Sequence, residues 1–286
     1  MSSTRRTVIL RLPVKAPGTG KTYRTTSPVS GRIKRISVVT NVPPGSLDPA
    51  PEVVLEGLWH SEFRASEQIT LGMGVSSWGN LTAQGDLVQA TGSKQPAYQA
   101  TGFNGGPAVV GDGSNDELVA TVTGLLSGAR PYAWVVLQRV AQVGAGDYLF
   151  TMLDSVPNGP NYLAVHTDAT KWFSDRGLAD GTENLDSVIA HDTGRHLIEF
   201  GATVGGTACF LIDGVAVNGT KSGALGANLT RLTALAVGGF GYASARIAHI
   251  VVASDAPSAG QITAMRAYFR GVNFPSYTGG SYGLPS

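Results

Sequence analysis

The chain has 286 residues, a formal net charge of +1 at pH 7, 14% charged residues and 38 glycines. This length allows one large β domain or two smaller ones, and much glycine with little charge favours an all-β protein over a helical enzyme. No run reaches the roughly 18 apolar residues of a membrane span. Cys209 is the one cysteine, which excludes an intrachain disulfide, and its apolar neighbours predict a buried packing residue.

Residues 1–50 hold nine Lys or Arg and one Asp, a net charge of +8, so the other residues carry −7. Two strand-like runs in this segment, TVILRL and RISVV, are too few to form a core. A basic arm on an acidic body is typical of a segment that docks on an acidic partner. We expect a protein partner, because Tyr23 is the only aromatic here and no nucleic-acid reading module is recognisable; a solvated tail is the alternative. The basic residues expected to make the attachment are Arg5, Arg6, Arg11, Lys15, Lys21, Arg32, Lys34 and Arg35.

The APGTGKT stretch at residues 16–22 is similar to a phosphate-binding loop, but the motif needs Gly where Lys15 stands. The SPVSG run at residues 27–31 breaks the helix that should follow such a loop, so a turn between two strands is predicted. The start of the chain does not predict a secretory signal, because Arg11 and Pro13 interrupt its apolar run.

A Pro-rich stretch at residues 41–53 predicts an extended linker. We therefore expect an arm at 1–50, a body at 51–275 and a tail at 276–286. The body is a series of short strand-like pieces separated by Gly, Asp, Asn and Pro, which predicts a sandwich or barrel. The predicted strands are 52–60, 86–91, 107–113, 117–124, 132–141, 147–153, 161–167, 187–191, 196–204, 207–217, 229–239 and 245–254.

Two local patterns in the body are specific. Asp213-Gly214 lies between apolar runs and predicts a hairpin with a two-residue type I′ turn. Near the end, Ser258 and Gln261 have the spacing of a capping box and predict the start of a helix. Its apolar face and its end are predicted at Ile262, Met265, Phe269 and Gly271.

The body resembles LamG-like, concanavalin A-like lectin/glucanase domains, as found in phage virion and bacterial surface proteins. The opening matches through the Leu58-Trp59 pair and through Val75 and Trp78, and the QATGSKQPAYQATGFNGGPAVVGDGSNDEL run at residues 89–118 matches the family's next stretch. Gly111 departs from the Phe usual in the family. The resemblance covers about residues 54–274 and implies a jelly-roll sandwich of two antiparallel sheets with one short C-terminal helix.

Glycosidases share this fold, but they need two carboxylates across a sugar cleft, and the chain has no E-x-D-x-x-E run. The acidic cluster of Asp180, Glu183 and Asp186 is predicted to be a solvated loop. A second acidic cluster allows calcium binding, although a structural turn with side-chain caps is the favoured alternative. Its candidate ligands are Asp112, Asn115 and Asp116. No cofactor other than this calcium is expected.

His196 begins an apolar strand and is predicted to be a hydrogen-bonded structural histidine. The aromatics Trp134, Tyr148 and Tyr162 alternate with apolar residues and are predicted to lie in the core. Trp172 stands among polar residues, as in a loop, and is the candidate for a stacked sugar or an inter-subunit contact. The full set of predicted carbohydrate or partner contacts is Trp172, Phe173, Asp180 and Glu183.

Together these features predict a non-enzymatic structural or recognition protein of a phage virion, either a head decoration protein or a tail or fibre component. It would be made in the host cytoplasm, attach to other virion proteins through the arm, and form oligomers in the assembly. Cell-surface glycans are further candidate partners, whereas nucleic-acid binding and membrane insertion are not expected. The alternatives are a glycan-binding module of a bacterial surface protein and a diverged glycoside hydrolase.

Overall fold

The structure is a computed structural model, and it describes the body of the chain with several gaps. The described ranges are 50–82, 84–123, 130–141, 146–154, 162–167, 170–178, 181–190, 192–204, 206–218, 229–236 and 241–274. Side chains at 176–178, 181–184, 186–189 and 217–218 are outside this description. The predictions for the basic arm, the phosphate-loop-like stretch, Asp180 and the tail at 276–286 therefore lie outside the described residues.

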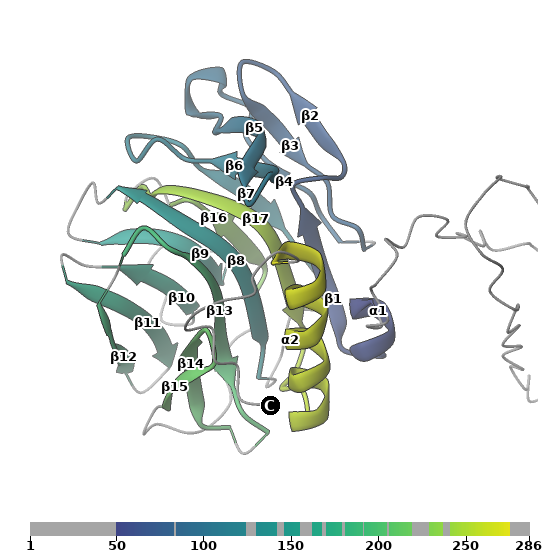
Figure 1. Ribbon diagram of the computed structural model, residues 1–286, viewed down its shortest axis with the longest axis vertical. Helices are drawn as coiled ribbons and strands as arrows, with labels where there is room; N and C mark the ends of the chain where they lie inside the picture. Colours follow the sequence, from purple (N-terminus) through teal and green to yellow (C-terminus); the bar gives the residue numbers. More distant parts are fainter. Residues whose placement is uncertain are drawn as a thin grey trace, which may run out of the picture. The chain divides into compact units, whose positions relative to one another are not determined.

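The first sheet, sheet A, has eight strands in the described part, and its path runs β15-β14-β13-β8-β17-β6-β5 with β1 also paired to β17 (Figure 1). Its neighbours pair antiparallel. The strand bounds are β1 Trp59–Arg64, β5 Ala97–Phe103, β6 Gly106–Val110, β8 Tyr132–Ala141, β13 Arg195–Ala202, β14 Ala208–Ile212, β15 Val215–Asn218 and β17 Ser244–Ala253.

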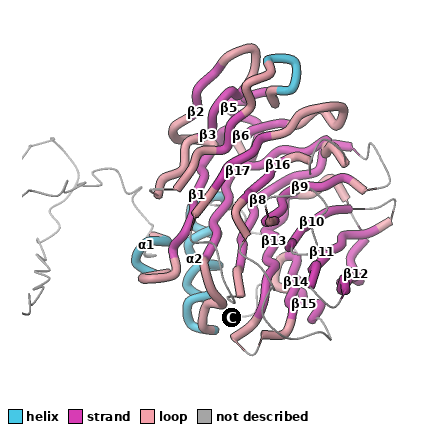
Figure 2. Tube along the Cα trace, turned by 180° about the vertical axis from the view of Figure 1, so that it is seen from behind, coloured by secondary structure: helices cyan, strands magenta, loops and turns pink. Residues whose placement is uncertain are grey.

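The second sheet, sheet B, has nine described strands in the order β12-β11-β10-β9-β16-β7-β4-β3-β2, again antiparallel. Figure 2 shows β9 to β12 side by side in sequence order. The strand bounds are β2 Ile69–Leu71, β3 Val75–Trp78, β4 Leu87–Val88, β7 Leu118–Thr121, β9 Asp147–Leu153, β10 Tyr162–Thr167, β11 Lys171–Leu178, β12 Gly181–Ala190 and β16 Arg231–Ala234. Two antiparallel sheets with one C-terminal helix confirm the predicted jelly-roll sandwich.

The main core lies between the two sheets. Because side chains alternate along a strand, every second residue of each inner strand enters this core. Phe150 and Phe200 meet edge to face with ring centroids 6.2 Å apart, one from each sheet. Phe63 and Trp78 make a second edge-to-face pair at 6.0 Å. These rings are fully buried and provide much of the apolar area that the sandwich removes from water.

A second core lies between the outer face of sheet A and helix α2, Ala259–Asn273, which runs beside β8 and β17 (Figure 1). Met265 and Phe269 of the helix pack on this face together with Trp134 of β8. The predicted capping box is confirmed, since Ser258 and Gln261 each bond the other's backbone amide. The helix continues through Gly271 and ends at Asn273, two residues later than predicted.

The structure also tests three local predictions, for the turn at Asp213-Gly214, for Cys209 and for the strand at 52–60. Asp213 and Gly214 have φ values of 52° and 82°, and they join β14 to β15, which confirms the type I′ hairpin. Cys209 is buried, as predicted. The predicted strand at 52–60 is wrong in its first half, because Pro51–Val54 forms a helical turn, α1, with proline at its start. A 3₁₀ turn, η1, spans Gly92–Lys94. No helix in the described part of the chain is long and apolar enough to cross a lipid bilayer.

Candidate functional site

The predicted aromatic contact at Trp172 needs correction. Residues 171–178 form strand β11 rather than a loop, and Trp172 is 0% exposed in the core between the sheets. Its ring meets the edge of His196 with centroids 5.2 Å apart. A buried indole cannot stack on a sugar in this conformation. Phe173, its neighbour, projects from the opposite face of the strand because successive side chains alternate.

The predicted acidic loop at residues 180–186 is also wrong as a loop. Residues 181–190 form strand β12 at the edge of sheet B, paired with β11. In backbone register Glu183 lies opposite Arg176 and Asp186 opposite Phe173. Pairing with β11 therefore overrides the turn propensity of the Gly- and Asn-rich sequence.

The candidate calcium cluster is arranged as a turn with side-chain caps. Asp112 Oδ1 accepts the backbone amides of Ser114 at 2.7 Å and Asn115 at 3.4 Å. Asp116 Oδ2 accepts the amide of Asp112 at 2.9 Å, and burial raises the pKa of Asp116 with a further contribution from the Asp112 charge. This geometry matches the structural alternative. Among the described residues no group of three or more His, Cys, Asp or Glu side chains is placed to hold a metal ion.

His196 is the structural histidine that its place at the start of a strand predicts. Its Nδ1 lies 2.7 Å from Asp213 Oδ2 and its Nε2 lies 2.8 Å from Asp192 Oδ1. Burial lowers the pKa of His196, but the two carboxylates outweigh burial and the net pKa is raised. Asp213 also accepts the backbone amide of Leu197. Through its bonds to His196 and Leu197, Asp213 ties the β14–β15 turn to β13.

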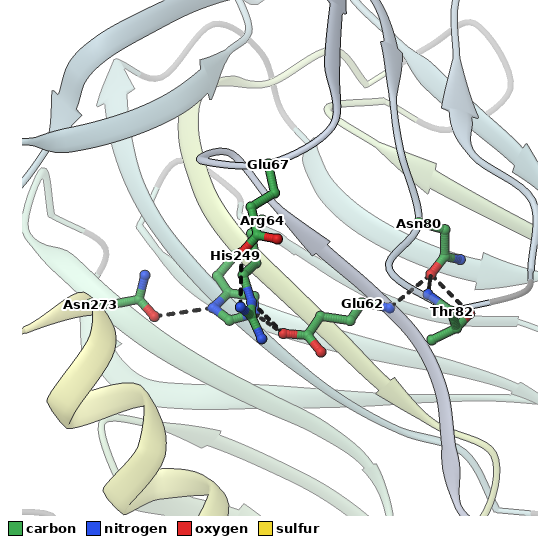
Figure 3. Close-up of polar contacts among 7 residues, drawn as sticks. All are labelled: Glu62, Arg64, Glu67, Asn80, Thr82, His249 and Asn273. Atoms are coloured by element: carbon green, nitrogen blue, oxygen red, sulfur yellow. Dashed lines mark hydrogen bonds and ion pairs between the residues drawn. The ribbon is translucent and has the colours of Figure 1, made fainter. Parts of the chain in front are cut away.

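One hollow in the described part, of about 350 Å³, lies where β1, the β5–β6 turn, β17 and the end of α2 meet. Its floor is His249, which is 1% exposed. His249 Nε2 lies 2.9 Å from Glu62 Oε1, and its Nδ1 lies 3.2 Å from Asn273 Oδ1 (Figure 3). Arg64 pairs with Glu62 at 2.6 Å and with Glu67 at 2.9 Å. The ionisable groups around this hollow are therefore bound to one another.

The charge balance in this network favours an ionised Glu62. Burial raises the pKa of Glu62, but the hydrogen bonds and charges of His249 and Arg64 outweigh burial, so the net pKa is lowered. Asn80 Oδ1 accepts the backbone amide of Glu62 and thereby fixes the position of β1 (Figure 3). Because Asn273 is the last residue of α2, the network joins the helix to the sheet and acts as a structural clamp.

The outer face of sheet B carries a second set of polar side chains, apart from the network at α2. Pairing places Thr233 of β16 opposite Thr151 of β9 and opposite Val119 of β7. The residues between them along each strand, such as Leu232 and Met152, belong to the main core. Alternation therefore puts the two threonines and Val119 on the face that points away from the core.

Aromatic side chains form a row on this face. Tyr148 stacks on His166 with ring centroids 4.9 Å apart, and His166 stacks on Phe173 at 5.3 Å. The ammonium of Lys171 lies 5.6 Å from the centre of the Phe173 ring. Burial, with the nearby charge of Asp175, raises the pKa of Tyr148 to about 12. The prediction that Tyr148 belongs to the core is wrong, because it lies half-buried on the outer face.

Several buried polar atoms on this face have no hydrogen-bond partner. They come from four adjacent strands, β16, β9, β10 and β11. Native proteins pair nearly all such atoms, so a cluster of unpaired ones indicates a place for water or a ligand. His166 Nε2 lies 2.8 Å from Asp175 Oδ2, within ion-pair range, yet without hydrogen-bond geometry. The atoms are Arg231 Nε, Thr233 Oγ1, Thr151 Oγ1, His166 Nδ1, His166 Nε2 and Asp175 Oδ1.

A hollow of about 460 Å³ opens on the same face, over β4, β7 and β16. Its walls combine the apolar Val88 and Val119 with the hydroxyl of Thr121 and the guanidinium of Arg231. Thr121 lies directly opposite Arg231 in the sheet. Apolar walls with a few converging polar groups are the usual composition of a small-ligand site. We take this hollow and the unpaired atoms beside it as the candidate site.

The sequence predictions missed most of these residues. Arg231 and Thr233 alternate with Leu232 and Ala234, so period-two analysis separates the two faces of the strand. That pattern does not reveal which other strands lie beside them. Phe173 is the one predicted contact residue whose described side chain lies on the candidate face.

No protein-family model matches this chain, and no curated protein sequence matches it. Among solved structures, the Trypanosoma rangeli sialidase matches with a TM-score of 0.54 and 12% identity, over 77% of this chain and 34% of that chain. The same enzyme in complex with the inhibitor DANA matches with a TM-score of 0.52 and 13% identity, over 80% and 35%. The likeness lies in the fold, and this chain spans about a third of the sialidase. It agrees with the concanavalin A-like sandwich that the sequence resemblance implied.

Proposed function

We propose that this protein is a non-enzymatic recognition protein whose lectin-like β-sandwich binds a glycan on the outer face of sheet B. The observation that carries the proposal is the hollow at Arg231 beside buried polar atoms that lack partners. Sugars present many hydroxyls, each both donor and acceptor, together with apolar C–H surfaces. The mixture of threonine hydroxyls, a guanidinium and valine side chains on this face is complementary to such a ligand.

We place this recognition in a phage virion. The support is the sequence resemblance of the body and the charge asymmetry between the +8 arm and the acidic remainder. In this proposal the arm binds other virion proteins and the body contacts a cell-surface glycan, with many copies in the assembly. Whether the protein co-purifies with intact particles in fixed stoichiometry tests this setting, and its absence from particles would contradict it.

A diverged glycoside hydrolase is the rival for the same face. Such an enzyme needs one protonated and one ionised carboxylate across the sugar. On the candidate face the carboxylate of Asp175 is already within 2.8 Å of His166 Nε2. The non-enzymatic proposal expects no reducing sugar to be released from any glycan that the protein binds, and release above background would favour the hydrolase.

A glycan array probed with the full chain tests the binding proposal directly. Val88 and Val215 make a matched pair, because they are 48% and 46% exposed on strands, and only Val88 lines the hollow. Val88→Glu fills the hollow and neutralises Arg231, so binding to the array ligands should fall at least tenfold, by about the value of one charge-assisted hydrogen bond. Val215→Glu should bind like the wild type. A blank array, or equal losses in both variants, would overturn the site.

A further inference from the structure

Arg231 differs from several other arginines of the described residues in its lack of a carboxylate partner. Arg64, Arg130, Arg139 and Arg266 each form an ion pair with Asp or Glu. Arg231 forms no such pair with a described residue, and its buried Nε has no hydrogen-bond partner among them. A guanidinium stays charged at any physiological pH. Its charge is thus partly removed from water, and no carboxylate of the described residues is paired with it.

The polar groups around Arg231 do not supply that balance. Gln89 lines the same hollow, but its Nε2 donates to the Glu117 carbonyl at 3.0 Å and its Oε1 accepts the Thr91 amide at 3.0 Å. Thr121 adds only a neutral hydroxyl. A ligand entering the hollow therefore meets a guanidinium whose buried Nε has no described partner, together with two threonines, Thr121 and Thr230, beside the apolar Val88 and Val119.

From this arrangement we infer that the glycan bound on this face carries a carboxylate, and that Arg231 is its anchor. The inference rests on the proposed function. A planar carboxylate matches the fork of a guanidinium with two parallel hydrogen bonds, whereas a neutral sugar would leave the charge unbalanced. Residues outside the arm carry a net charge of −7, so attraction of an anion must come from a local cation and not from the overall charge.

The test compares 3′-sialyllactose with lactose, two probes that differ by the carboxylate-bearing sugar. The wild-type chain should bind 3′-sialyllactose at least about tenfold more tightly, the value of a hydrogen bond to a charged group. Arg231→Gln should abolish this preference. Arg231→Lys keeps the charge but loses the fork, so it should keep part of the preference; it also serves as the test variant if Arg231→Gln does not fold.

Arg246→Gln is the matched control. Arg246 is a partly exposed arginine of sheet A whose guanidinium contacts Gln99 at 3.4 Å and Gln138 at 3.5 Å. This variant should keep the full preference, with its melting transition checked in parallel. Equal binding of both probes by the wild type, or an unchanged preference in Arg231→Gln, overturns the inference and leaves glycan binding standing. If the wild type binds 3′-sulfolactose more tightly than 3′-sialyllactose, the anion that Arg231 recognises is a sulfate, and the inference of a carboxylate is wrong. No binding of any probe, together with a blank array, would remove the proposed function as well.

Discussion

The outer faces of the two sheets both bury polar side chains, but they do so in different ways. On sheet A, Glu199 is 0% exposed and accepts from Arg266 Nε at 2.7 Å and from the Tyr132 hydroxyl at 3.2 Å. On sheet B, the hydroxyls of Thr151 and Thr233 are equally buried and have no partner.

On sheet A the buried polar groups hold the helix in place, whereas on sheet B they are open to a ligand. The partners of Glu199 and Glu62 include Arg266 and, through His249, Asn273, both on α2. These pairs fix the helix over sheet A, where Met265 and Phe269 complete an apolar core. Neither described helix packs on the outer face of sheet B in the same way. Some buried atoms on the sheet A side also lack a hydrogen-bond partner, among them Glu62 Oε2, Trp134 Nε1 and Tyr268 Oη. That side is covered by α2, whereas a hollow opens beside the unpaired atoms of sheet B, which makes sheet B the candidate for recognition.

The largest effect is expected from breaking a buried pair on sheet A. Glu199→Ala leaves the half-buried Arg266 guanidinium and the buried Tyr132 hydroxyl without their carboxylate acceptor, and it should lower the free energy of unfolding by about 3 kcal/mol in urea titrations. The control is Glu67→Ala, which removes the exposed partner of Arg64 and should cost no more than about 1 kcal/mol. Equal losses in the two variants would mean that the buried pair does not hold α2 in place.

A smaller effect of opposite sign is expected on sheet B. Thr233→Val replaces an unpaired buried hydroxyl by a methyl group of similar volume, so it should raise the free energy of unfolding by about 1 kcal/mol. The control is Thr82→Val, since the Thr82 hydroxyl donates to the His60 carbonyl at 2.7 Å and its loss should destabilise. A destabilised Thr233→Val would show that water or another group satisfies the hydroxyl, which would weaken the contrast between the faces.

The smallest expected effect is on how the free energy of unfolding depends on pH. The folded pKa of Glu62 is lowered, because His249 and Arg64 outweigh burial, so folding favours the carboxylate. Near the ordinary pKa of a glutamate, the unfolded chain therefore binds more protons than the folded chain, and the free energy of unfolding rises with pH in that range. The contribution of Glu62 is present above its unfolded pKa and is lost as pH falls through its lower folded pKa. Glu62→Gln should show a flatter stability profile below about pH 4.5. An unchanged profile would indicate that other carboxylates control the acid limb.

The sequence predicted a large part of the fold because local chemistry dictated it. Alternation of apolar and polar residues marked the strands, and Asp213-Gly214 fixed a turn that needs positive φ. Ser258 and Gln261 fixed the start of α2. These features depend on residues a few positions apart, so they can be recognised without knowing the rest of the molecule.

The candidate site depended on tertiary structure. Trp172 and Phe173 are adjacent in a polar segment, and only the packing of β11 against the core decides that Trp172 is buried and Phe173 faces outward. The hollow joins Val88, Val119 and Arg231, which come from three strands far apart in the chain. Period-two alternation defines two faces for each strand, but the energy of burial, summed over both sheets, selects which one enters the core. The sequence determined the strands and the turns by itself, and the packing of the sheets decided which polar residues were paired and which remained free.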